Sequence, residues 1–174
     1  MNFLLTGELH SGKSTVIKKT LCELDMRVGG FCTTFGSNRE SPDRLLCMHR
    51  ADLPPEIDMD HAIAVFSAGD RQSLPERFDE LGCRFLLEAE GLAEIIIMDE
   101  LGALEKDAEK FQKAVLKTLD MPGPVLGVLR KGFSDWTKNI AEREDVCVIT
   151  VTADNRDELP MILSDLILKS INVC

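Results

Sequence analysis

Short apolar runs alternate with segments of helical periodicity along most of the chain. The runs are continuously apolar, as in parallel strands covered on both faces, and they occupy residues 2–6, 94–99, 125–129 and 146–151. The segments between them place apolar residues three and four positions apart, which is the spacing of an amphipathic helix. Alternating strands and helices predict an α/β fold with a mostly parallel sheet, right-handed crossovers and helices on both faces. The predicted helices span residues 13–24, 74–91, 105–119, 133–143 and 157–171.

Residues 28–67 depart from this alternation because they hold strand-like runs without a helical one. A turn-rich segment at 36–43 separates two of these runs, which are expected to form a β-hairpin. We therefore predict a single domain over residues 1–174, with residues 28–67 as a β insertion. The strands expected in the insertion are Phe31–Phe35, Arg44–His49 and Ala62–Phe66.

The segment that joins the first strand to the first helix carries a nucleotide-binding motif. Residues 7–14 read Gly-Glu-Leu-His-Ser-Gly-Lys-Ser, which satisfies G-x-x-x-x-G-K-[ST]. In such a loop the backbone N–H groups surround phosphates, and the following helix adds its positive N-terminal end. We expect Lys13 to contact the phosphates and Ser14 to supply an oxygen to Mg²⁺. The predicted nucleotide-binding residues are Gly7, Glu8, Leu9, His10, Ser11, Gly12, Lys13, Ser14 and Thr15.

An acidic pair follows the most apolar of the predicted strands. Asp99 and Glu100 come directly after Ile95-Ile96-Ile97-Met98, and ligands of parallel sheets collect at the carboxyl ends of strands. Asp99 is therefore predicted to hold Mg²⁺, and Glu100 to orient or deprotonate an attacking water. Glu105 either faces the same cleft or begins the next helix, and the helix dipole favours the second placement.

Two cations follow the predicted strand at 125–129 and are expected at the same edge of the sheet. A cation there would stabilise charge on a transferring phosphoryl group. Arg130 therefore joins Glu100 and Lys13 as a candidate catalytic residue, although Arg130 and Lys131 would also be typical of a surface pair.

Further polar residues are candidates for the rim of the cleft. Thr33 and Thr34 would reach it from the hairpin. Asn155 and Arg156 follow the last strand, where they would border the base or ribose, but helix capping by Asp154 or Asn155 explains the pattern equally well. Residues of metal-ligand type also occur without a metal-like spacing, which favours an acidic loop, at Asp58, Asp60 and His61.

Composition limits the partners of the chain. The net charge of −10, from 20 Lys+Arg against 30 Asp+Glu, argues against nucleic acid or an anionic membrane as a partner. The N-terminus lacks the basic start of a secretory signal, and no apolar run approaches the ~20 residues that span a bilayer. The cysteines match no zinc or disulfide pattern and are expected to be reduced. We therefore expect a cytoplasmic protein, and the sequence identifies no protein partner.

These motifs occur together, in the same order, in a known family. The chain resembles the small P-loop nucleoside-triphosphatases, also called cancer-related nucleoside triphosphatases. The resemblance implies a RecA-like P-loop NTPase fold and slow hydrolysis of ATP, GTP and other nucleoside triphosphates, with loose base preference. The segments that carry it are TGELHSGKST (6–15), GFCT (30–33), IIIMDELGALE (95–105) and TADNRD (152–157).

The resemblance also assigns roles and exposes one departure. Lys13 and Ser14 match the phosphate loop of the family, as do Gly7 and Gly12, and Asp99 and Glu100 match its metal and base positions. Leu9-His10 stands where the family usually has Pro-Gly. Glycine adopts positive φ at no cost, but histidine is enriched there among the other residues, so the loop is still expected to close.

Two other functions compete with hydrolysis. A nucleotide or small-molecule kinase would transfer the γ-phosphate to an acceptor, but the sequence shows no clustered arginines of the kind a kinase lid carries. A non-catalytic nucleotide-binding module would bind without turnover, and the departure at Leu9-His10 is consistent with it. Phosphate release without an acceptor separates hydrolysis from both alternatives.

Overall fold

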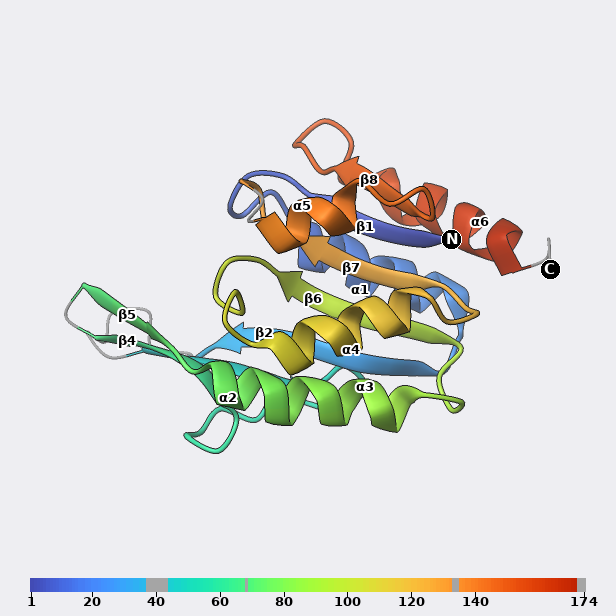
Figure 1. Cartoon of the computed structure of the whole chain (residues 1–174). Coiled ribbons are helices and arrows are strands. Elements are labelled where there is room, and N and C mark those ends of the chain that lie inside the picture. The colour runs from blue at the N-terminus through green and yellow to red at the C-terminus, as the bar shows by residue number, and fades with distance from the viewer. Residues whose placement is uncertain (37–43, 68, 133–134, 172–174) are drawn as a thin grey trace.

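The fold is built on one mixed β-sheet. A computed structural model describes residues 1–36, 44–67, 69–132 and 135–171. Its strands are β1 (Asn2–Thr6), β2 (Val28–Phe35), β3 (Arg44–Arg50), β4 (Ala62–Ser67), β5 (Asp70–Ser73), β6 (Ile95–Leu101), β7 (Val125–Leu129) and β8 (Val146–Thr150). They lie in the order β5-β4-β3-β2-β6-β7-β1-β8 (Figure 1). Neighbouring strands are parallel in the part β2-β6-β7-β1-β8 of this order. They are antiparallel in the part β5-β4-β3-β2.

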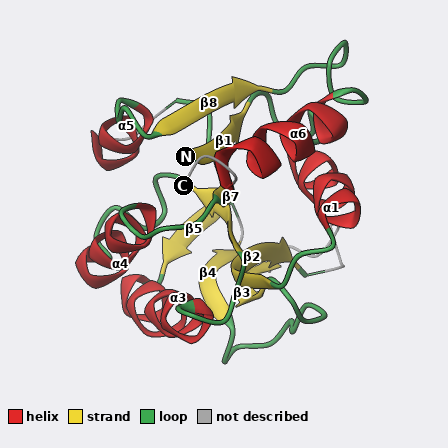
Figure 2. Ribbon diagram, turned by 90° about the vertical axis from the view of Figure 1, so that its right-hand side faces the viewer, coloured by secondary structure: helices red, strands yellow, loops and turns green. Residues whose placement is uncertain are grey.

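Helices cover both faces of this sheet. They are α1 (Lys13–Leu24), α2 (Pro75–Arg77), η1 (Phe78–Gly82, a π-helical turn), α3 (Cys83–Ala89), α4 (Glu109–Leu119), α5 (Asp135–Ala141) and α6 (Leu159–Ile171). Figure 2 shows α1 and α6 on one face and α3, α4 and α5 on the other. The predicted α/β fold, with a mostly parallel sheet, helices on both faces and a β-hairpin, is therefore confirmed. Among the described helices, none has both the length and the apolar character that crossing a bilayer requires.

Alternate residues of the central strands pack into two separate core layers. On β1, Leu4 joins the cluster under α3, α4 and α5, whereas Leu5 joins the cluster under α1 and α6. On β6, Met98 and Ile97 alternate in the same way. Because helices cover both faces, a ligand reaches the central strands at their ends, and in parallel sheets it does so at the carboxyl ends.

Residues 28–67, predicted as a β insertion, hold strands of two kinds. β2 pairs in parallel with β6 and so lies inside the central sheet, whereas β3 and β4 are antiparallel. β5 extends the antiparallel part, and its polar sequence Asp-Arg-Gln-Ser gave no strand signal. Residues 37–43 of the predicted turn lie outside the described residues.

Helix boundaries differ from the prediction in identifiable places. The predicted helix 74–91 contains η1, where a Cβ on Gly82 would lie 2.2 Å from the ring of Phe111 on α4. That close approach leaves no room for a side chain at position 82. The predicted helix 105–119 begins at Glu109 instead, because Glu105 belongs to a turn before it. The last helix begins at Leu159, and residues 133–134 of the predicted helix 133–143 lie outside the described residues.

Candidate functional site

The loop between β1 and α1 has the backbone of a phosphate-binding nest. Gly7 and Gly12 adopt φ values of 141° and 100°. A Cβ at Gly7 would lie 2.5 Å from the carbonyl oxygen of Val151, so only glycine fits there. His10 has φ 62°, in the left-handed region where the family usually places glycine. His10 therefore adopts the left-handed backbone conformation at this position, although most residues other than glycine do so only at a cost in free energy.

The Lys13 ammonium lies over this loop. Its Nζ donates hydrogen bonds to the carbonyl oxygens of Gly7, at 3.1 Å, and of Glu8, at 2.8 Å. The hydroxyl oxygen of Ser11 is buried and has no hydrogen-bond partner within the described part of the chain. A positive charge and an unpaired hydroxyl thus belong to the same small loop, and both are groups that bind phosphate oxygens.

Ser14 and Asp99 join the phosphate loop to the end of β6. Asp99 is 8% exposed, and its carboxylate accepts a hydrogen bond from the Ser14 side chain. Burial raises the pKa of Asp99 to about 6, partly offset by the bond from Ser14. A hydroxyl beside a buried carboxylate offers oxygen donors only, which is the ligand chemistry of Mg²⁺. The two residues therefore fit the metal that the sequence predicted there.

Two ion pairs cross the same edge of the sheet. Arg130 Nη1 lies 3.4 Å from Glu100 Oε1, and the Glu100 side chain is 35% exposed. Lys131 pairs with the Glu8 carboxylate, and this ion pair holds the pKa of Glu8 below its usual value. Since Arg130 and Lys131 follow β7 directly, the ends of β6, β7 and β1 all meet here, as predicted from the strand order along the chain.

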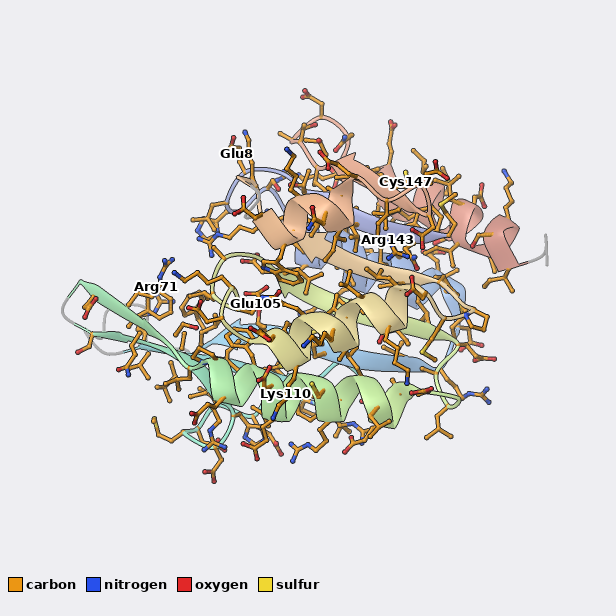
Figure 3. The ribbon with its side chains drawn as sticks, viewed as in Figure 1. Glu8, Arg71, Glu105, Lys110, Arg143 and Cys147 are labelled. Carbon is orange, nitrogen blue, oxygen red and sulfur yellow. The ribbon has the colours of Figure 1, made fainter. Side chains whose placement is uncertain are left out.

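Glu105 is placed differently from the favoured prediction. It does not begin a helix: it is 2% exposed, and its Oε1 accepts a hydrogen bond from the backbone N–H of Gly102. Burial raises the pKa of Glu105 to about 7. Figure 3 shows Glu8 and Glu105 on the same side of the molecule, from the phosphate loop and from the loop after β6. Glu105 therefore does not begin a helix, and its carboxylate is buried against the loop that follows β6.

The remaining candidates divide between the rim and other parts of the molecule. The Arg156 side chain lies beside the phosphate loop, because its Cδ is 3.6 Å from the Cβ position of Gly12. Asn155 does not cap α6, since its side chain binds the N–H of Thr152 and the carbonyl of Thr150. Thr34 binds the His49 ring at 3.0 Å.

Asp58, Asp60 and His61 lie in the loop between β3 and β4. Asp58 binds His61 within that loop, through the His61 backbone N–H and ring. Over the described residues, no group of three or more metal-ligating side chains is clustered.

The sequence did not single out two contacts of the loop after β6. Trp136 Nε1 on α5 donates to the carbonyl of Gly102 at 2.8 Å, and the Ser73 hydroxyl on β5 donates to the carbonyl of Leu104. Trp136 is the only tryptophan in the chain, but neither residue stands in a motif. Both contacts bring distant segments to this loop, which local sequence does not reveal.

Known proteins resemble the chain over nearly its full length. The family model described as NTPase matches residues 2–164. Nucleoside-triphosphatase THEP1 of Thermofilum pendens is 36% identical over 168 residues, which cover 91% of each chain. Nucleoside-triphosphatase THEP1 of Thermotoga maritima is 29% identical over 170 residues, again 91% of each chain.

Solved structures resemble the fold over a similar extent. The crystal structure of THEP1 from Aquifex aeolicus matches with a TM-score of 0.77 at 24% identity, covering 96% of this chain and 99% of that one. The solution structure of a human cancer-related nucleoside triphosphatase matches with a TM-score of 0.65 at 26% identity, covering 95% and 96%. The likenesses in sequence and in fold each cover more than nine-tenths of the chain for these relatives.

Proposed function

The chain belongs to the NTPase family, and on that premise we propose that it hydrolyses nucleoside triphosphates to diphosphate and phosphate, with Mg²⁺ as cofactor. Its membership confirms the resemblance drawn from the motifs. The observation that carries the proposal is the hydrogen bond between Ser14 and Asp99, because it joins the phosphate loop to the acidic end of β6. We therefore assign both halves of the motif set, the phosphate loop and the acidic pair, to one ligand.

Binding of the triphosphate is assigned to the loop at 7–15. Its backbone N–H groups and the N-terminus of α1 surround the phosphates. In the structure Lys13 Nζ donates hydrogen bonds to two neutral carbonyl oxygens, those of Glu8 at 2.8 Å and Gly7 at 3.1 Å. A charged phosphate oxygen is a stronger acceptor for an ammonium group than a carbonyl is, so Lys13 exchanges these contacts for the ligand.

Ser14 and Asp99 are the residues that would hold Mg²⁺. A Mg²⁺ ion held there would supply positive charge against the negative charge that develops on the phosphates. With a pKa of about 6, Asp99 is ionised at neutral pH and available as a ligand. The Ser14 hydroxyl, which donates a hydrogen bond to Asp99, would supply a second oxygen to the same ion.

Glu100 is assigned the proton transfer. A water oxygen attacks the γ-phosphorus, the bond to the bridging oxygen breaks toward the diphosphate, and Glu100 accepts the water proton. The exposed side of Glu100 gives water access, and Arg130 pairs with it at 3.4 Å. We assign to Arg130 the stabilisation of charge on the transferring phosphoryl group, because it lies beside Glu100.

Loose base preference is supported by the rim of the site. The loop after β8 brings the Arg156 side chain to Gly12, and a guanidinium plane offers a stacking surface that suits any base. The sequence contains no N-K-x-D segment of the kind that reads guanine. We therefore include ATP, GTP and other nucleoside triphosphates among the substrates.

Substitution of Glu100 tests the proposed mechanism. Glu100→Gln keeps the shape of the side chain but loses its basicity, so turnover of Mg-ATP should fall at least ~10²-fold, the scale of general-base effects. Affinity for Mg-ATP, measured by calorimetry, should stay within about threefold of the wild type, since Glu100 does not bind the ground state.

The matched control is Glu109→Gln, an exposed glutamate on α4, which should change neither quantity. Turnover by Glu100→Gln equal to that of the control would remove Glu100 from the base position. Loss of nucleotide binding in Glu100→Gln would also contradict the assignment, because the role proposed for it belongs to the chemical step.

A further inference from the structure

Glu105 is a buried carboxylate placed next to the proposed catalytic machinery. It is 2% exposed, and within the described residues no Lys or Arg side chain forms an ion pair with it. Its carboxylate instead accepts a hydrogen bond from the backbone N–H of Gly102, two residues after Glu100. Burying an ionisable group without a cation is unfavourable, so a structural role alone would be served better by a neutral side chain.

The segment that Glu105 holds is fixed from several directions. The carbonyl of Gly102 accepts the indole N–H of Trp136 at 2.8 Å, and the carbonyl of Leu101 accepts the N–H of Arg130 at 2.8 Å. On the other side of Glu105, Gln112 Nε2 donates to the Glu105 carbonyl at 2.9 Å. The backbone after Glu100 is therefore clamped between β7, α5 and α4.

Electrostatics link the same carboxylate to the catalytic pair. The charges of Glu100 and Arg130 both act on Glu105, in opposite directions. Gly102 also sits under Arg130, because a Cβ there would lie 3.2 Å from the Arg130 Cβ. A shift of the Gly102 peptide would thus move the backbone next to Glu100 and the surface against which Arg130 packs.

We propose that Glu105 is a positioning residue for hydrolysis, which fixes the Gly102 peptide so that Glu100 and Arg130 face the γ-phosphate. The proposal rests on the proposed function. The carboxylate accepts the Gly102 N–H as a charge-assisted hydrogen bond, which is stronger than a neutral one. Misplacement of a reacting group by about 1 Å costs roughly 10²-fold in rate, so loss of this bond appears in the chemical step.

The kinetic test compares Glu105→Ala and Glu105→Gln with wild type and the Glu109→Gln control, all well below their unfolding midpoints. For Glu105→Ala we expect kcat for Mg-ATP to fall about 10- to 100-fold while KM changes less than about threefold. Glu105→Gln keeps an acceptor oxygen for Gly102, so it should recover part of kcat. A Glu105→Ala variant within about twofold of wild type, or no recovery in Glu105→Gln, would overturn the proposal.

Trp136 supplies a readout that does not depend on turnover. Its indole donates to Gly102, so loosening of that peptide should shift its emission to longer wavelength in Glu105→Ala and less in Glu105→Gln. Identical spectra of Glu105→Ala and wild type would overturn the proposal. Lack of hydrolysis by the wild type would instead contradict the proposed function, whereas hydrolysis that Glu105→Ala leaves unchanged would contradict only the role of Glu105.

Discussion

At the scale of single residues, the site depends on side chains and backbone angles that are costly elsewhere. His10 holds a φ of 62°, and Asp99 and Glu105 are acidic groups in a largely buried setting. Such features persist where the surrounding structure fixes them, and they are common at functional sites. Histidine tolerates the left-handed region better than most residues, so the phosphate loop can keep its conformation with His10 in place of glycine.

The burial of Glu105 predicts a pH dependence of stability. Its pKa rises from an ordinary 4.5 to about 7 in the folded chain, so between these values the folded state binds more protons than the unfolded state. The free energy of unfolding therefore decreases as pH rises through this window, by at most about 1.4 kcal/mol per pH unit. Replacement by the neutral Glu105→Gln removes this contribution.

Denaturant unfolding at pH 5.5 and pH 8 measures the effect. The difference in unfolding free energy, Glu105→Gln minus wild type, should be more positive at pH 8 than at pH 5.5. Glu100 and Arg130, the charged groups that act on Glu105, and the raised pKa of Asp99 are common to both proteins and cancel to first order. Equal differences at the two pH values would contradict an ionised, buried Glu105.

At the scale of elements, the sequence predicted the strands that are buried on both faces. It did not predict the segments whose conformation depends on contacts with distant parts of the chain. The central strands β1, β6 and β7 were predicted because they are continuously apolar. β5 was missed because its four residues, Asp70–Ser73, are polar. Glu105 was favoured as a helix start because the helix dipole stabilises an acidic residue there. In the structure its carboxylate instead accepts a hydrogen bond from the Gly102 N–H. The roles of Trp136 and Ser73 required the fold, since each contacts the loop from a distant segment.

The start of α4 shows such a tertiary contact and predicts a stability change. The N–H of Phe111, in the first turn of α4, is bound at 2.8 Å by the Asp79 carboxylate of η1, so the neighbouring helix supplies the cap. Asp79→Ala should lower the free energy of unfolding by about 1 kcal/mol, as for other lost caps. Asp79→Asn retains an acceptor oxygen and should lose less in urea denaturation. Equal losses in the two variants would show that the hydrogen bond is not the source.

At the scale of the whole molecule, a net charge of −10 opposes an anionic ligand. Four cationic side chains nevertheless lie at the edge of the sheet that carries the phosphate loop: Lys13, Arg130, Lys131 and Arg156. Figure 3 places Arg71, on the projecting β5, on this side as well. Arg130 and Lys131 are paired with Glu100 and Glu8, so a bound triphosphate competes with acidic side chains for them.

The most direct test follows the oxygen of the attacking water. The wild-type chain is incubated with Mg-ATP in H₂¹⁸O without any added acceptor, and products are analysed by mass spectrometry. Attack by a water held at Glu100 predicts ADP and phosphate in equal amounts, with one ¹⁸O in each phosphate released. Formation of ADP only after a nucleoside or small-molecule acceptor is added, or binding of Mg-ATP with no phosphate released, would contradict the assignment of this chain as a hydrolase.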